Sequence, residues 1–456
     1  MLFNSFHFIF LIINIIISQQ KQENYDPQLL YGWNVINFTT SKGVTECKTC
    51  MPAGIKLDYK GNIYVSFPRW KDNVIATLAK LDPKTKSFIP WPSESENDVS
   101  DPKMLQSVLG FEIHNDTIYV LDQGIVNQQE AKKGSMKVVV YNVNGTRNTS
   151  YDLTSMTNPT NSFLNDIVID PEKKIAYISD SGNPLNPNEQ HFPQILKLYL
   201  NARSSEESNP TVEKLLEPQH YSLMPEDTYW LTINGKKVNP DSPMKTGVDG
   251  IALSCDYKIL YYTPLTSKKL YSLNVDTYNQ DEFTKGNIKV SEAYKNISSD
   301  GILASKNGVL YMTSLEDGRI YIKKDMDDDL DNFSYKNMNY SIGNDTTMWP
   351  DTLALFNSSL YFISNQLHLF IHDETKFDDP SVLNFRIYNI SIADDDGSYI
   401  EGCRNGGYSW TITNIVIWIV FAVLILVVLS FVLMSSHKQE ESVDKHMSIG
   451  LLKEPN

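Results

Sequence analysis

The sequence predicts an all-β fold, a six-bladed β-propeller, with a single C-terminal transmembrane helix. Three observations lead to this prediction. A pattern of two apolar strands joined by a polar turn recurs six times along the body of the chain. Helical periodicity is nowhere comparable in strength within that body. One long uncharged segment follows the last copy of the pattern.

Residues 1–18 have the pattern of a secretory signal peptide. Phe8 to Ile17 form an apolar run that only Asn14 interrupts, and Ser18 is a small residue at a plausible cleavage point. The chain becomes polar immediately afterwards, at Gln19. An uncleaved anchor is the alternative, but the apolar run is short for a membrane span. We therefore expect these residues to be removed.

The repeated pattern has the spacing of propeller blades. Each copy has a period-2 apolar strand, a polar turn often containing Gly or Asn, and a second strand rich in Ile, Tyr and Val. Copies start roughly 50 to 56 residues apart, except for one longer gap, which is typical of a four-stranded blade. A two-sheet sandwich is the alternative, but it does not usually repeat one unit so often. The copies begin at Ala53, Leu109, Asn165, Asp249, Asp300 and Asp351.

Three further features fit this architecture. A third strand follows the second in several copies, for example at Lys137–Tyr141. The longer gap holds two expected loop insertions, Asn183–Glu189 and Glu217–Pro243. Closure of the ring needs a strand from one terminus to complete the last blade, and Leu30–Phe38 is the candidate.

Residues 412–434 are the candidate membrane span, because they are uncharged and dominated by Ile, Val, Leu and Phe. At about 1.5 Å per residue, such a helix crosses a hydrocarbon core of roughly 30 Å. A buried soluble helix is rarely this long without charge, and a cleaved lipid-anchor signal would not precede the polar segment 435–456. We expect a single-pass type I membrane protein at the cell surface or in an endomembrane lumen. Its parts are a propeller at 29–403, the span, and a cytoplasmic tail at 435–456.

The cysteines and glycosylation sequons agree with an oxidising compartment. All four cysteines, Cys47, Cys50, Cys255 and Cys403, lie in the expected lumenal part, and their even number allows two disulfides in three possible pairings. Cys47 and Cys50 lack the second pair of ligands that a zinc site would need. The candidate glycosylation sites are Asn37, Asn115, Asn144, Asn148, Asn296, Asn332, Asn339, Asn344, Asn357 and Asn389.

Charge and missing motifs exclude several functions. The net charge of -15 argues against a general nucleic-acid-binding protein, which needs a basic face. The chain has no P-loop, nucleophile elbow or dinucleotide fingerprint. Asp122 and Asp180 follow second strands, where turns explain them.

Six segments resemble, in order, the motifs of the yellow/major royal jelly protein family. Phe67–Trp70 with Val74–Leu78 resembles its PRW…GVPATL signature, although Asn73 stands where the family has Gly and Ile75 where it has Pro. The other five segments are Pro90–Ser93, Val120–Gly124, Ala176–Ser181, Tyr262–Ser267 and Asn384–Ile387. The resemblance covers about residues 29–403 and implies a six-bladed propeller, in agreement with the blade count. Familiar members are soluble, so the membrane anchor is a departure.

The resemblance implies two kinds of function, because some family members bind small amines and others act in pigment pathways. The sequence itself contains no catalytic constellation, so we expect a binding module for an amine-like ligand or a partner protein. One alternative is an enzyme, either a pigment-pathway isomerase or a metal-dependent, lactonase-like hydrolase. A structural or adhesive surface protein is a further alternative.

Polar residues at the starts of blades three to six form the candidate site. The starts of the innermost strands surround one mouth of the channel in a propeller. Here they are Asn165, Asp166, Asp249, Asp300 and Asp351, whereas the first two copies begin with apolar residues. Carboxylates and an amide oxygen suit Ca²⁺ or an organic cation. The alternative is a structural role, in which these side chains cap turns.

Overall fold

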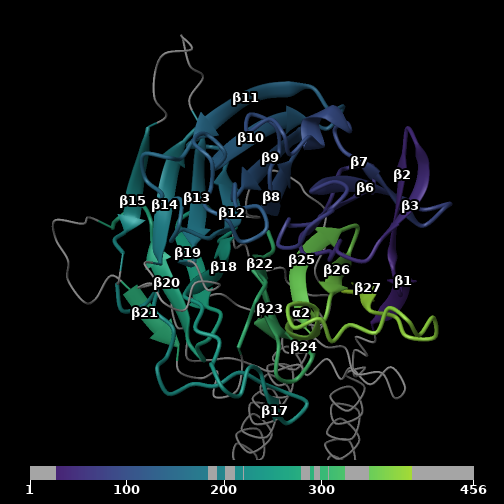
Figure 1. Cartoon of the computed structure of the whole chain (residues 1–456). Helices are drawn as coiled ribbons and strands as arrows, with labels where there is room; N and C mark the ends of the chain where they lie inside the picture. Colours follow the sequence, from purple (N-terminus) through teal and green to yellow (C-terminus); the bar gives the residue numbers. More distant parts are fainter. Residues whose placement is uncertain are drawn as a thin grey trace, which may run out of the picture. The chain divides into compact units, whose positions relative to one another are not determined.

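The computed structural model describes residues 27–182, 193–200, 211–218, 220–278, 288–291, 298–306, 308–323 and 349–392. All of them lie within one compact unit, Met1–Cys403. They form six blade sheets and one small two-stranded sheet (Figure 1). The innermost strands contact one another in the ring order β4, β8, β12, β18, β22, β25 and back to β4. The predicted six-bladed propeller is therefore confirmed.

Each blade is an antiparallel sheet whose strands follow one another outwards from the channel. Blades 1 to 3 contain β4 (Ile55–Leu57), β5 (Ile63–Ser66), β6 (Leu78–Asp82) and β7 (Ser87–Pro90); β8 (Val108–His114), β9 (Thr117–Asp122), β10 (Lys137–Asn142) and β11 (Arg147–Asp152); and β12 (Leu164–Asp170), β13 (Ile175–Asp180), β14 (Gln194–Tyr199) and β15 (Val212–Leu216). Blades 4 to 6 contain β18 (Val248–Leu253), β19 (Ile259–Pro264), β20 (Leu270–Asn274) and β21 (Ile288–Ser291); β22 (Ile302–Ala304), β23 (Leu310–Ser314) and β24 (Arg319–Lys323); and β25 (Pro350–Phe356), β26 (Ser359–Ser364) and β27 (Phe385–Ser391).

The predicted closing segment is divided between two blades. Strand β1 (Gln28–Trp33) pairs with β27 and completes blade 6, as expected. Strand β2 (Ile36–Thr40) instead runs parallel to β7 of blade 1 and continues into β3 (Gly43–Cys47). The chain turns at Asn34, whose side-chain amide donates hydrogen bonds of 2.8–2.9 Å to three backbone carbonyls of the segment before β27. Ring closure is therefore confirmed for the first half of the predicted strand only.

The hydrophobic core is divided among the blade interfaces. In the described residues, a separate cluster of buried side chains lies between each pair of neighbouring blades. Between blades 2 and 3, for example, Leu121 and Val138 pack with Ile178 and Leu196. Both faces of each sheet are buried in this way, which explains why many strands have consecutive apolar residues rather than a strict alternation with polar ones.

Glycine allows the innermost strands to approach each other closely. A Cβ atom on Gly110, Gly250 or Gly301 would lie 2.4, 2.4 or 2.3 Å from a backbone carbonyl oxygen of the next blade. Each of these glycines is the second residue of its copy. Asp166 and Thr352 occupy the equivalent position in blades 3 and 6. Asp166 is thus the one charged side chain at this level of the channel.

Replacing Gly301 by alanine is expected to destabilise the protein by about 3 kcal/mol, because the new Cβ would overlap the backbone oxygen of Asp351. Gly308→Ala is the matched control. Its Cβ meets no atom within 4 Å, although its φ of 75° adds strain of about 1 kcal/mol. Urea unfolding of both variants measures the difference. Equal losses would show that the strand contact tolerates a side chain.

The insertion Glu217–Pro243 contains secondary structure and is not only a loop. It contains the small hairpin of β16 (Thr232–Ile233) and β17 (Lys236–Lys237). Its apolar side chains, among them Leu231 and Ile233, pack against Trp349 at the start of blade 6. The other predicted insertion, Asn183–Glu189, lies outside the described residues.

The predictions about cysteines and termini have different outcomes. Cys47 and Cys50 form a disulfide with each other, which is one of the three pairings that the sequence left open. Cys255 is also disulfide-bonded, and Cys403 lies outside the described residues. Within the described part of the chain, no helix is long and apolar enough to span a membrane. Residues 1–18 and 412–434 lie outside that part, so the signal peptide and the span stay predictions.

Six of the predicted glycosylation sites are in described segments. Asn115, Asn144, Asn148 and Asn357 are exposed, and Asn37 and Asn389 are partly exposed. The remaining four, Asn296, Asn332, Asn339 and Asn344, lie outside the described residues.

Candidate functional site

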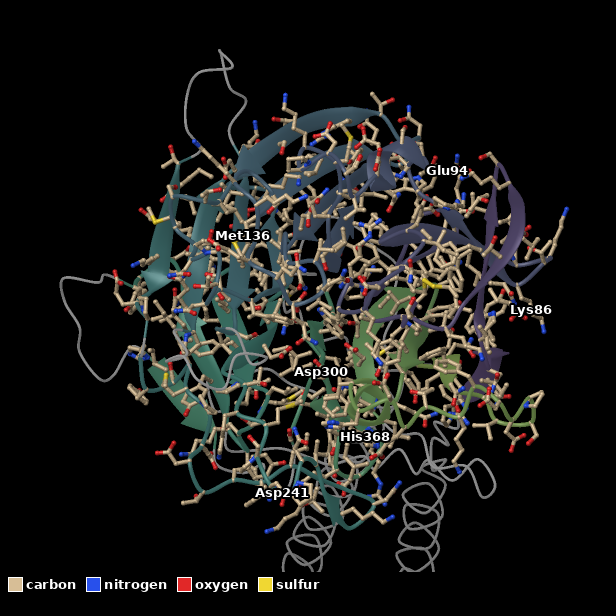
Figure 2. All side chains as sticks on the ribbon, in the orientation of Figure 1. Lys86, Glu94, Met136, Asp241, Asp300 and His368 are labelled. Atoms are coloured by element: carbon tan, nitrogen blue, oxygen red, sulfur yellow. A yellow bond between two sulfur atoms is a disulfide. The ribbon has the colours of Figure 1, made fainter. Side chains whose placement is uncertain are left out.

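The five predicted site residues all line one cavity at a mouth of the channel, here called the upper chamber. Asn165 and Asp166 are on β12, Asp249 is on β18, Asp300 lies two residues before β22, and Asp351 is on β25. The cavity has a volume of about 110 Å³. Asp300 lies near the centre of the propeller (Figure 2). The structure therefore brings together every residue of the predicted site.

Each carboxylate of blades 4 to 6 accepts a hydrogen bond from a fixed side chain. The Asn165 amide donates to Asp249 Oδ2 at 2.7 Å. The Trp349 indole N–H donates to Asp300 Oδ2 at 2.5 Å. The Asn365 amide donates to Asp351 Oδ2 at 2.6 Å. These donors hold the three carboxyl groups in place.

Asp249 and Asp300 are neighbouring carboxyl groups whose pKa values are both raised. Burial raises the pKa of Asp249 well above its usual range, and the neighbouring Asp300 raises it further. Burial raises the pKa of Asp300 to about 6, while hydrogen bonds from Trp349 and Asp249 oppose this rise. The two groups therefore titrate as a pair that holds a proton more readily than free carboxyl groups do.

Asp351 and Asp166 are the other two carboxyl groups of the chamber. Burial raises the pKa of Asp351, and the charge of Asp300 raises it further. The carboxylate of Asp166 accepts hydrogen bonds from the backbone N–H groups of Ile167 and Ile251 at 2.8 and 3.2 Å. Burial raises its pKa to about 6, and the nearby Lys56 ammonium limits the rise. Crowded carboxyl groups with raised pKa values form an environment that favours a cation.

The apolar side of the chamber comes from the loop between β5 and β6 of blade 1 and from the residue that precedes β12 of blade 3. Trp70 follows Arg69, which is buried and donates hydrogen bonds to three backbone carbonyls that fix this loop. The ring centroids of Trp70 and Phe163 are 6.1 Å apart. Asn73, which stands where the family motif has Gly, has a φ of 62°, a conformation that Gly and Asn both adopt readily.

The short helix α2 (Leu367–Phe370) borders the chamber from blade 6. The Lys71 ammonium lies 4.4 Å above the Phe370 ring and pairs with Asp373. This contact joins the loop of blade 1 to α2. Leu367 and Phe370 add further apolar surface to the chamber.

Trp349 is the functional candidate that sequence reasoning missed. It is fully buried and has a φ of 58°, which is strained for a bulky side chain. Its ring stacks on His368 at a centroid distance of 5.8 Å, and burial lowers the pKa of His368 to about 4. The packing of the insertion behind Trp349 directs its indole N–H towards Asp300. Its position next to Pro350 in the sequence gives no sign of this role.

Asp122 and Asp180 lie away from the chamber and hold the inner strands in place. Both are fully buried. Asp122 accepts hydrogen bonds from the backbone of Gln106 and Ser107 at 2.7 and 2.8 Å and pairs with Lys137 at 3.0 Å. These contacts of Asp122 fix the residues that directly precede β8. Asp122 therefore has a structural role beyond the turn that the sequence predicted.

The described residues contain no group of three or more His, Cys, Asp or Glu side chains arranged to hold a metal ion. The side-chain donors on Asp249, Asp300 and Asp351 occupy oxygens that a hard cation would use. A Ca²⁺ ion at this rim stays a prediction that a titration can test.

Three comparisons relate the chain to known proteins. The model of the family described as "Major royal jelly protein" matches residues 106–185 and 230–398, more than half of the chain. The chain is 23% identical to major royal jelly protein 2 of Apis mellifera, covering 83% of this chain and 86% of that protein. It is 22% identical to dopaminechrome tautomerase of Drosophila melanogaster, covering 85% and 88%. A luciferin-regenerating enzyme structure covers 83% of this chain and 98% of its own, at 14% identity and a TM-score of 0.46.

Proposed function

The chain belongs to the major royal jelly protein family, and on that premise we propose that its propeller binds a small aromatic amine in the upper chamber. The observation that carries the proposal is the arrangement of four desolvated carboxyl groups opposite an apolar wall. An ammonium group near Asp300 relieves the repulsion between the carboxylates. The aromatic ring of the ligand lies against Trp70 and Phe163.

An amine fits this site better than Ca²⁺ does. Calcium takes about six to eight oxygen ligands, including waters and backbone carbonyls, and gains nothing from an apolar wall. The upper chamber instead combines acidic residues with Leu109, Phe163, Met244 and Leu367. A ligand with one charged end and one aromatic end uses both halves of this lining.

Calorimetric titration of the purified full-length chain tests the proposal. The probes are tyramine, para-ethylphenol, which is the same molecule without its amine, and Ca²⁺. We expect tyramine to bind and para-ethylphenol to bind at least about tenfold more weakly, because only the amine reaches the carboxylates. Equal binding of the two phenols, or no binding of tyramine, would contradict the proposal. Binding of Ca²⁺ alone would favour the metal alternative.

A tautomerase is the second candidate function, and the raised pKa values of the neighbouring Asp249 and Asp300 favour it. A tautomerisation removes a proton from one position of a substrate and returns a proton to another, without net oxidation. A carboxylate next to a carboxylic acid can perform both steps. One relative is named a dopaminechrome tautomerase. The decay of dopaminechrome absorbance with the wild type and with Asp300→Asn distinguishes an enzyme from a binding protein.

We also propose that the propeller faces the lumen or the cell exterior and is anchored by residues 412–434. The Cys47–Cys50 disulfide supports this location, because disulfides form and persist in oxidising compartments. Four exposed sequon asparagines on the propeller are accessible for glycosylation.

Protease treatment of intact cells and sealed vesicles tests this topology. We expect the propeller and the tail after Ser435 to lie on opposite sides of the membrane. On intact cells, protease should digest a propeller that lies at the cell surface and leave the tail protected. In lumen-enclosed vesicles the tail is digested and the glycosylated body is protected; detergent, as the control, exposes both. Digestion of the body in lumen-enclosed vesicles, with protection of the tail, would contradict the type I orientation.

A further inference from the structure

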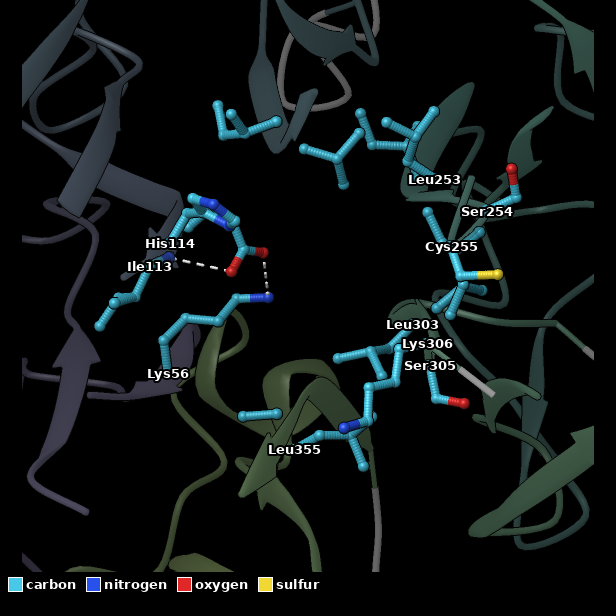
Figure 3. A pocket seen from close by; sticks show the side chains of 18 of the residues that line it. Lys56, Ile113, His114, Leu253, Ser254, Cys255, Leu303, Ser305, Lys306 and Leu355 are labelled. Carbon is cyan, nitrogen blue, oxygen red and sulfur yellow. Dashed lines mark hydrogen bonds and ion pairs between the residues drawn. The ribbon is translucent and has the colours of Figure 1, made fainter. Parts of the chain in front are cut away.

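A second cavity, here called the lower chamber, lies along the same inner strands beyond the upper chamber (Figure 3). Its volume is about 170 Å³. Lys56, Asp166 and Ile302 line both chambers, so these residues lie where the two cavities adjoin. Asp166 occupies the level at which four other blades have glycine.

The walls of the lower chamber are mainly aliphatic. Val168 comes from blade 3, Leu253 from blade 4, Leu303 from blade 5 and Leu355 from blade 6. The labelled leucines surround the opening in Figure 3. Such a lining, with a few polar groups at fixed positions, is typical of a small-molecule site. Its aromatic lining residues are His114 and Tyr257, and the upper chamber instead has Trp70, Phe163 and Phe370.

Each carboxylate oxygen of Glu112 and Asp166 already accepts a hydrogen bond or an ion pair from the protein. Glu112 Oε2 pairs with the Lys56 ammonium at 3.0 Å, and Glu112 Oε1 accepts the backbone N–H of Ile113 at 2.9 Å. Both oxygens of Asp166 accept backbone N–H groups. A lysine ammonium has three donors, and Lys56 directs one of them to Glu112. Lys56 therefore has further donors that a ligand in the chamber can use.

A second ammonium group lies at the opposite side of the opening. Lys306 follows β22, and its side chain extends into the chamber beside Leu355 (Figure 3). Lys56 reaches inwards from blade 1 (Figure 3). Two lysine amines thus border a mainly aliphatic space.

We propose that the lower chamber binds a small aliphatic carboxylate of the medium-chain fatty acid class. Its carboxylate accepts hydrogen bonds from the amines of Lys56 and Lys306, and its alkyl chain packs against the leucines of blades 4 to 6. An alkylamine is disfavoured, because its ammonium group would lie beside the like charges of Lys56 and Lys306, and each carboxylate oxygen of Glu112 and Asp166 already has a protein donor. This site is separate from the amine site proposed above and does not depend on it.

Calorimetric titration of the purified full-length chain with octanoate, octanol and octylamine tests the inference. We expect octanoate to bind saturably and octylamine to bind at least about tenfold more weakly. In Lys306→Met, octanoate affinity is expected to fall by about tenfold and to approach that of octanol. Equal affinities of octanoate and octylamine in the wild type would overturn the proposal, as would unchanged octanoate affinity in Lys306→Met.

Two further variants place the ligand in the lower chamber. Ala304→Phe fills part of the cavity and is expected to abolish octanoate binding. Leu303→Gln places a polar group on the aliphatic wall and serves if the larger residue impairs folding. Tyramine binding is the control, because neither residue lines the upper chamber. Octanoate binding that survives in a folded variant would overturn the proposal, whatever the outcome for tyramine.

Discussion

Amine affinity is expected to fall by at least about 30-fold when Asp300 is replaced by asparagine. With pKa values of about 6, Asp300 and Asp166 are the carboxyl groups of the upper chamber that carry charge at neutral pH, and Asp166 has Lys56 beside it. Removing one partner of a desolvated charge pair costs about 2 to 5 kcal/mol, and each 1.4 kcal/mol is about a factor of ten in affinity. Calorimetric titration of Asp300→Asn with tyramine measures the loss.

The thermal stability of the same variant separates a binding role from a structural one. If Asp300 only caps a turn, its loss lowers the melting temperature. If it belongs to a cation site, replacing one of several crowded carboxylates relieves repulsion, and the melting temperature at neutral pH is unchanged or higher. Asp241→Asn, an exposed site on the insertion, is the charge-matched control for both measurements. Unchanged tyramine affinity in Asp300→Asn would place the amine elsewhere.

The propeller could be predicted from the sequence because each blade repeats the same local pattern. The start of every copy, its turn and its second strand depend on neighbouring residues, and the structure confirms all six innermost strands. The closing strand was predicted only in part. The separation of β1 from β2 depends on the contacts of Asn34 with a segment more than 340 residues later in the chain. No local pattern indicates such a contact.

The acidic half of the upper chamber could be predicted for the same reason, since repeat position alone places Asp249, Asp300 and Asp351 at one mouth. The groups that control them could not. Trp349 reaches Asp300 from a backbone with a positive φ, and α2 lines the chamber from the connection between β26 and β27. No sequence pattern indicated the lower chamber, because Lys56 and Lys306 lie on different blades and line the same cavity only in the folded ring.

Tyramine affinity is expected to rise with pH through about 6. The amine stays protonated in this range, since alkyl ammonium groups titrate near pH 10. Asp300, with a pKa of about 6, loses its proton. Below that pKa, binding must release one proton, so affinity falls by about tenfold for each pH unit. Titrations at pH 5, 6 and 7, chosen as roughly spanning this pKa, measure the slope. Asp300→Asn is expected to lose most of it.

The unliganded protein should show the opposite dependence in its stability. The folded-state pKa of Asp300 is about 6, above the ordinary value of 3.8, so its contribution to stability is complete below about 3.8 and is lost as the pH rises through about 6. His368 acts in the other direction, because its lowered pKa of about 4 gives stability that is lost as the pH falls below 6.5. The difference in melting temperature between the wild type and Asp300→Asn removes the histidine contribution. We expect the wild type to lose stability relative to the variant between about pH 4 and pH 7. A constant difference across this range would mean that Asp300 does not titrate there and would remove the basis for the pH-dependent affinity.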